Sequence, residues 1–224
     1  MKFKRKKIFI TGIGGYVGSA LAQKLSPAYD VVGYGHLGDK VVLSKLLGSR
    51  VKLVEGDITN AYAILKASRG AYAVIHTAAP TTEKFCKEHP WEAVQAIVRG
   101  TAIVRDVVVK NKIPLLIHFS SQAVYSNFKV RSMPLRESME LLPDSLYGAF
   151  KAEAEWELTQ NKRGRMFPVR LFCGLPIFTG AALEFFGIMS RMCLRVKLKT
   201  GSLFVSTEAR NALILCMFGT LFGL

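Results

Sequence analysis

Tyr147 and Lys151 have types and spacing suited to acid–base chemistry. They are four residues apart in a segment with a helical pattern, so both side chains project from one face. A tyrosine phenol with its ordinary pKa of about 10 is a poor base at neutral pH, but a neighbouring ammonium group lowers that pKa. Ser121 follows an expected strand, and its hydroxyl could hold a substrate oxygen while Tyr147 moves the proton. The alternative is a surface tyrosine packed over a lysine stem, because this spacing is common by chance.

A glycine-rich turn, Thr11-Gly-Ile-Gly-Gly-Tyr-Val-Gly18, joins the first expected strand to the first expected helix. Gly12 lets the chain turn sharply, Gly15 lets a pyrophosphate approach the backbone, and Gly18 lets the helix pack closely on the strand. The helix N-terminus adds free N–H groups and a positive dipole end. This context favours a dinucleotide-binding turn over a purely structural one, and it indicates NAD or NADP. The cofactor contacts expected here are Gly12, Gly14, Gly15, Tyr16, Val17 and Gly18.

The adenosine end of the cofactor is expected at the ends of the second and third strands. Where an acidic residue usually holds the ribose hydroxyls, the chain has Gly35 and His36. No carboxylate there would repel a 2′-phosphate and no arginine is placed to bind one, although Lys40 might reach, so NAD and NADP both stay open. Asp57 could accept the adenine amino hydrogens, with Ile58 beside the ring. The alternative for Asp57 is a cap on the following helix, a role that Thr59 or Asn60 could also fill.

Strand and helix patterns alternate along the chain, which is typical of a parallel sheet with helices on both faces. The expected fold class is α/β, a doubly wound parallel sheet of the Rossmann type. The apolar runs predict strands at 7–11, 30–34, 51–55, 73–77, 115–120 and 166–171. Long helices are expected at 16–25, 91–110 and 146–161, the last capped by Ser145 or Asp144. Residues 1–176 are the expected NAD(P)-binding domain, and 177–224 a small, partial substrate-binding lobe.

Composition narrows the partners and the compartment. The 224 residues carry a formal net charge of +15, which suits a polyanion or anionic lipid but also a solvated surface around phosphate-bearing ligands. No nucleic-acid motif accompanies the charge, so a nucleic-acid partner is not expected. No secretory signal is visible, and the apolar run 212–224 is too short to cross a bilayer, so a cytoplasmic protein is expected. Neither a disulfide framework nor a metal site is expected from the scattered cysteines Cys86, Cys173, Cys193 and Cys216.

Four bulky or titratable side chains are expected to pack rather than bind ligands. His76 and His118 lie in apolar strands, which favours hydrogen-bonded core histidines. Trp91 and Trp156 are expected to pack on helix faces rather than stack on a base.

Taken in order, these residues resemble the extended short-chain dehydrogenase/reductase family, in particular its NAD-dependent epimerase/dehydratase branch. The resemblance covers about residues 7–176. The similar segments are Thr11-Gly-x-x-Gly-x-x-Gly18, Gly56-Asp-Ile58, His76-Thr-Ala-Ala79, Phe119-Ser-Ser-Gln-Ala-Val-Tyr125 and Tyr147-Gly-Ala-Phe-Lys151.

That resemblance implies an enzyme that moves a hydride between a substrate carbon and a nicotinamide. It makes Ser121, Tyr147 and Lys151 the catalytic residues, with Lys151 also anchoring the nicotinamide ribose. The implied substrate is a nucleotide-activated sugar or a similar hydroxyl or ketone compound. A homodimer through the helices 91–110 and 145–161 is also implied. The further cofactor contacts implied by the resemblance are Thr77, Ala78, Ala79, Ser120, Tyr147 and Lys151.

Two departures from the family pattern keep other functions open. Ile97 precedes Val-Arg-Gly-Thr101 where the family has an asparagine that supports the catalytic lysine, and Cys173 replaces another asparagine after the sixth strand. These changes, with the short C-terminal lobe, favour the alternative of a cofactor-binding sensor or scaffold with little catalysis. A third hypothesis is a membrane-surface dehydrogenase for a lipid-like alcohol, suggested by the basic patches and the apolar run 212–224.

Overall fold

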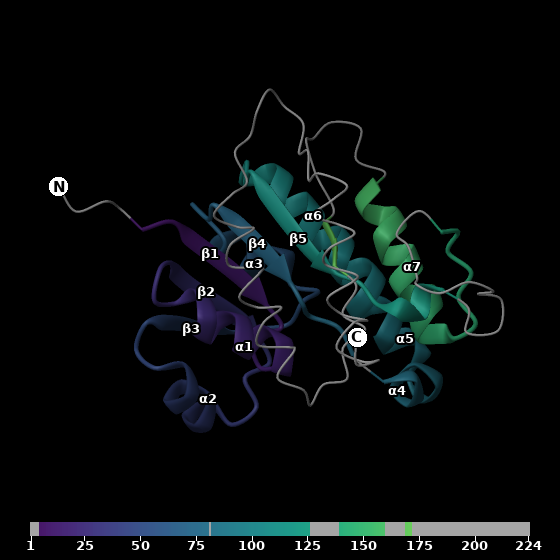
Figure 1. Cartoon of the computed structure of the whole chain (residues 1–224), viewed down its shortest axis with the longest axis horizontal. Helices are drawn as coiled ribbons and strands as arrows, with labels where there is room; N and C mark the ends of the chain where they lie inside the picture. Colours follow the sequence, from purple (N-terminus) through teal and green to yellow (C-terminus); the bar gives the residue numbers. More distant parts are fainter. Residues whose placement is uncertain (1–4, 81, 126–138, 160–168, 172–224) are drawn as a thin grey trace, which may run out of the picture.

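The computed structural model describes residues 5–80, 82–125, 139–159 and 169–171, and its centre is a six-stranded parallel sheet (Figure 1). The strands run in the order β3-β2-β1-β4-β5-β6, which is that of a doubly wound Rossmann sheet. The fold class is therefore the one expected. The strands are β1 (Lys7–Thr11), β2 (Asp30–Gly35), β3 (Val51–Glu55), β4 (Ala73–His76), β5 (Leu115–Phe119) and β6 (Val169–Leu171).

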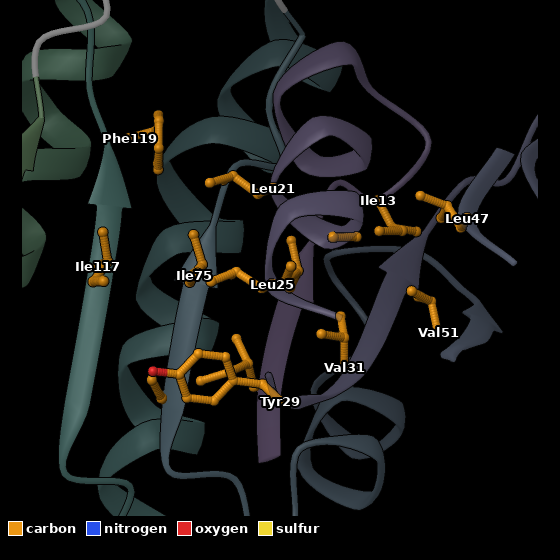
Figure 2. Close-up of a cluster of buried hydrophobic side chains, with 14 of the residues drawn as sticks. Ile13, Leu21, Leu25, Tyr29, Val31, Leu47, Val51, Ile75, Ile117 and Phe119 are labelled. Carbon is orange, nitrogen blue, oxygen red and sulfur yellow. The ribbon is translucent and has the colours of Figure 1, made fainter. Parts of the chain in front are cut away.

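Helices cover both faces of the sheet because successive strand side chains point to opposite sides. On one face, α1 (Tyr16–Leu25) and α2 (Lys40–Leu47) bury Leu21, Leu25 and Leu47 against alternate strand residues such as Val31 and Ile75 (Figure 2). On the other face, α3 (Ala61–Ala67), α6 (Gly100–Lys110) and α7 (Leu146–Thr159) pack over the intervening strand residues.

The long helix expected at 91–110 is divided. It consists of α5 (Pro90–Val94), one π-helical turn η1 (Gln95–Arg99) and α6. The Gly100 N–H bonds to the Gln95 carbonyl five residues earlier, which defines the π turn. The Thr101 hydroxyl donates to the Ile97 carbonyl at 2.6 Å and supports that turn from within the fold.

Several short elements were not expected from the sequence. They include α2, α4 (Glu83–Glu88) and a 3₁₀ turn η2 (Gln122–Val124). Of the two candidate caps for α7, Ser145 is the one used, since its Oγ accepts the Gly148 N–H at 3.0 Å. Trp91 and Trp156, which were expected to be packed, are instead 70% and 53% exposed.

The C-terminal expectations lie outside the described residues. These are the lobe 177–224 with its boundary at 176, the run 212–224, and the residues 166–168 and 160–161 at the ends of the expected sixth strand and last helix. Within the described part of the chain, no helix is both long and apolar enough to span a bilayer.

Candidate functional site

The glycine turn lies at the carboxyl end of β1, where the strand order of the sheet reverses between β1 and β4. Gly12 has a φ of +74°, and a Cβ there would come within 2.7 Å of the Ala78 amide nitrogen, so only glycine fits. A Cβ on Gly18 would collide with the Gly12 carbonyl oxygen, which shows how closely α1 packs on the turn. Gly15 is exposed and a Cβ there would meet only the Gly12 oxygen at 3.3 Å, so its outer side is open.

A cavity of about 790 Å³ opens over this turn, within the usual range for a cofactor site. It is enclosed by the glycine turn, the ends of β2 and β3, and the segment after β4. The expected cofactor contacts that line it are Gly12, Gly14, Gly15, Tyr16, Val17, Gly18, Gly35, His36, Asp57, Ile58, Thr77, Ala78 and Ala79. The residues expected from the sequence thus form one wall of a single cavity and come from four separate segments of the chain.

The far wall of the cavity was missed. Residues of α4, α5 and η1 complete it, and the signal for α4 was weak because the helix has only six residues. The local sign was Thr82, whose hydroxyl accepts the Phe85 N–H, followed by the acidic Glu83 in the first turn. The lining residues that the sequence did not indicate are Tyr34, Gly38, Pro80, Phe85, Glu92 and Ala96, whereas Gly56 belongs to the Gly56-Asp-Ile58 segment.

At the expected adenosine end, Asp57 both lines the cavity and closes a turn. Its Oδ1 accepts the Thr59 N–H at 2.7 Å and the Thr59 hydroxyl at 2.5 Å, and its Oδ2 lies 3.5 Å from His36 Nε2. These hydrogen bonds, with a smaller contribution from His36, lower the pKa of Asp57. Asn60, not Asp57, caps α3 through the Ala63 N–H. Lys40 begins α2 and is not among the described residues that line the cavity.

Ser121, Tyr147 and Lys151 gather at the carboxyl end of β5. The Ser121 and Tyr147 side chains hydrogen-bond to each other, and the buried Lys151 Nζ donates to the Phe119 carbonyl at 2.5 Å. Together with Ser120, these residues are not part of the described cavity lining. Tyr147 nevertheless packs in one cluster with Phe85 and Ala79, which do line the cavity, so the phenol lies behind that wall.

The expected lowering of the tyrosine pKa is not found. Burial raises the pKa of Tyr147, and the Ser121 hydrogen bond only partly offsets it. Lys151 instead bonds to the Phe119 carbonyl, and burial lowers its own pKa to about 8, against an opposing effect of Glu155. Phenol and ammonium share a helix face, as expected, but the ammonium bonds to the strand.

A buried polar layer lies next to this group, between the sheet and the helices α6 and α7. His76 is hydrogen-bonded on both sides, by Thr11 Oγ1 at 2.7 Å and Thr101 Oγ1 at 3.0 Å, as expected for a core histidine. His118 is also buried, but neither ring nitrogen has a hydrogen-bond partner among the described residues, which corrects the expectation for it. Ser120 Oγ is likewise buried without such a partner. In the described residues, no three His, Cys, Asp or Glu side chains come together as a metal site.

The sequence of this chain is similar to those of several known enzymes. The dTDP-glucose 4,6-dehydratase of Streptomyces antibioticus is 27% identical over 163 residues, which cover 66% of this chain and 46% of that protein. The human 3 beta-hydroxysteroid dehydrogenase type 7 is 29% identical over 182 residues, covering 77% of this chain and 47% of that protein.

Two solved structures have the same fold with NAD bound. One is a mutant UDP-glucuronic acid 4-epimerase from Bacillus cereus with a fluorinated UDP-sugar and NAD, with a TM-score of 0.64 and 26% identity over 73% of this chain and 55% of that one. The other is the dTDP-glucose 4,6-dehydratase of Streptomyces venezuelae, with a TM-score of 0.62 and 26% identity over 68% and 50%. The chain thus spans about half the length of these relatives. The model of the NAD dependent epimerase/dehydratase family matches residues 8–174, most of the chain, and the chain therefore belongs to that family.

Proposed function

We propose that this chain binds NAD in the cavity over the glycine turn and uses it to transform a nucleotide-activated sugar. The observation that carries the proposal is the cavity itself, because it lies at the reversal point of a Rossmann sheet and against the N-terminus of α1. The open side of Gly15 and the free amides of the first turn of α1 suit a pyrophosphate. The relatives that act on dTDP- and UDP-sugars support the substrate class.

The residues present fit such a cofactor at its adenosine end. Asp57 and Ile58 line the end suited to adenine, and Gly35 and His36 the place suited to its ribose. We favour NAD over NADP because the Asp57 carboxylate, kept ionised by its hydrogen bonds to Thr59, lines the cavity 3.5 Å from His36 Nε2 and would repel a 2′-phosphate beside His36. When bound, the nicotinamide would supply the hydride acceptor and donor.

The protein's own groups would handle the proton and the substrate oxygen. Ser121 would orient the substrate hydroxyl. The hydrogen bond between Ser121 and Tyr147 places the phenol beside the same position. Tyr147 would take or return the proton on that oxygen. Lys151 would hold the nicotinamide ribose and favour the phenolate form of Tyr147. To do so, its ammonium group must give up its hydrogen bond to the Phe119 carbonyl and bond to the ribose and the phenol instead.

A Gly15→Ala variant tests the binding site. Gly15 has ordinary backbone angles, and the added methyl group meets only the Gly12 oxygen at 3.3 Å, so the fold should tolerate it. The same methyl group covers the surface that a pyrophosphate must approach, so NAD affinity should fall by roughly tenfold or more, about 1.4 kcal/mol. Calorimetric titration measures it, with Val42→Ala on the exposed face of α2 as the matched control. Equal NAD affinity in the two variants would contradict the assignment.

A cofactor-binding sensor remains the second candidate, and a specific observation favours it. The pKa of Tyr147 is raised, so the phenol holds its proton more firmly than a free tyrosine. The Lys151 ammonium group is hydrogen-bonded to the Phe119 carbonyl instead of to the phenol. A panel of UDP- and dTDP-sugars separates the two functions. NAD binding with turnover of any sugar supports the enzyme, and tight NAD binding without turnover of any supports the sensor.

A further inference from the structure

The helix that carries Tyr147 is held at its N-terminus by a carboxylate from a distant part of the sequence. Glu83, the first residue of α4, accepts the Leu146 N–H at 3.2 Å and the Tyr147 N–H at 3.0 Å. Its carboxylate also hydrogen-bonds the Ser145 side chain. A helix leaves its first N–H groups without internal partners, and a negative charge there is favoured by the dipole. Glu83 therefore fixes the backbone of Tyr147 itself.

The same short helix forms part of the cofactor cavity. Phe85, two residues after Glu83, lines the cavity and packs in one cluster with Tyr147 and the buried Cys86. Thus α4 is linked to Tyr147 in two ways, by the Glu83 carboxylate at the backbone and by the packing of Phe85 and Cys86 in the same cluster as the Tyr147 side chain. Both contacts lie on an element that a bound cofactor would touch.

We propose that Glu83 is a positioning residue that fixes the phenol of Tyr147 relative to the cofactor cavity. The inference rests on the proposed function, because it assigns the phenol a role in proton transfer. Burial alone would raise the pKa of Glu83, but the hydrogen bonds from Tyr147, Ser145 and Leu146, together with Lys87, lower it overall. The carboxylate is therefore ionised at neutral pH and accepts without competing as a donor.

Three variants test the proposal by separating turnover from binding. Glu83→Ala removes both acceptor oxygens, so kcat should fall by on the order of 10²-fold, as small misplacements of a reacting group do. Glu83→Gln keeps one acceptor oxygen and should recover part of that loss. Glu88→Ala is the matched control, because it removes the same charge from the same helix, where Glu88 pairs with Lys84 at 3.8 Å and, among the described residues, makes no hydrogen bond to α7. The NAD affinity of all three should match that of the wild type.

Hydrogen exchange supplies a readout that does not depend on turnover. The amides of Leu146 and Tyr147 should exchange faster in Glu83→Ala than in Glu88→Ala, because only Glu83 accepts them. Equal kcat values in these two variants would overturn the positioning role and leave the proposed function standing. A parallel loss of NAD affinity and kcat in Glu83→Ala would also overturn it, since a general structural role predicts that. A wild-type protein with no turnover would overturn the proposed function and this inference together.

Discussion

At the scale of single residues, burial keeps two histidines of the core neutral. It lowers the pKa of both His76 and His118, the buried Lys151 ammonium group lowers both further, and the pKa of His76 falls to about 3. The hydrogen bonds then fix the His76 tautomer. Thr101 gives its proton to the Ile97 carbonyl, so it must accept from His76 Nε2–H, while Nδ1 accepts from Thr11. His76 is thus a neutral connector between β1, β4 and the π turn.

This state predicts how stability depends on pH. Below pH 6.5 the unfolded chain protonates His76 while the folded chain does not until about pH 3, so unfolding takes up a proton and stability falls as pH falls. Each such histidine contributes about 1.4 kcal/mol per pH unit within that window. In the His76→Gln variant, the unfolding free energy should therefore depend less steeply on pH between pH 6.5 and 5, by about 1.4 kcal/mol per pH unit. Urea unfolding at a series of pH values measures this slope.

The matched control for that measurement is His89→Gln, at the exposed end of α4. It removes an imidazole that lies outside the buried layer, so it controls for the loss of a histidine side chain as such. The window ends at pH 5 because the ionised Asp57 and Glu83, whose pKa values are lowered, contribute to acid unfolding only at lower pH. A His76→Gln slope equal to that of His89→Gln would show that His76 is not held neutral by the fold.

At the scale of elements, regular apolar runs were predictable and interruptions were not. The sequence predicted the bounds of β1, α1 and β3 as the structure has them, because apolar runs and glycine or proline breaks mark their ends. It did not predict the π turn, since Thr101 stabilises it through a hydrogen bond that also depends on His76, 25 residues earlier. Nor did it predict α4, whose six residues are too few to show a helical period.

The π turn can be tested through Thr101. Thr101→Val keeps the shape of the side chain but leaves the buried His76 Nε2–H without its acceptor, which costs about 1–3 kcal/mol of unfolding free energy. Thr101→Ser keeps the hydroxyl and loses only a buried methyl group, so it should cost about 1 kcal/mol. Urea unfolding at neutral pH compares the two. A valine variant as stable as the serine variant would mean that the Thr101 hydroxyl does not support the turn.

At the scale of the molecule, the sequence indicated one wall of the cavity but not the other. The glycine turn, Asp57 and the segment after β4 each follow a strand, and the carboxyl ends of parallel strands meet at one edge of a sheet. Phe85 and Glu92 reach the cavity from helices whose packing depends on contacts between distant segments, including the Glu83 bonds to α7. The spacing of apolar and capping residues within one segment does not indicate contacts with another, distant segment.

The helices α5 and α7 carry three large apolar side chains that are exposed to solvent. The two helices lie side by side (Figure 1). Trp91 on α5 is 70% exposed, and Leu146 and Trp156 on α7 are 41% and 53% exposed. Exposed tryptophans on adjacent helices are typical of protein interfaces. We therefore expect a homodimer through α5 and α7, the assembly that the family resemblance implies.

Light scattering after size-exclusion chromatography measures this assembly. Trp91→Glu should convert the dimer to a monomer, because it places a charge at the centre of an apolar interface, where desolvation is costly. Tyr62→Glu is the matched control, since Tyr62 lies on α3 and is 73% exposed. The control should remain a dimer, which separates a specific interface from general loss of apolar surface. A monomeric wild-type chain, or equal dissociation in both variants, would leave Trp91 and Trp156 without the interface expected here.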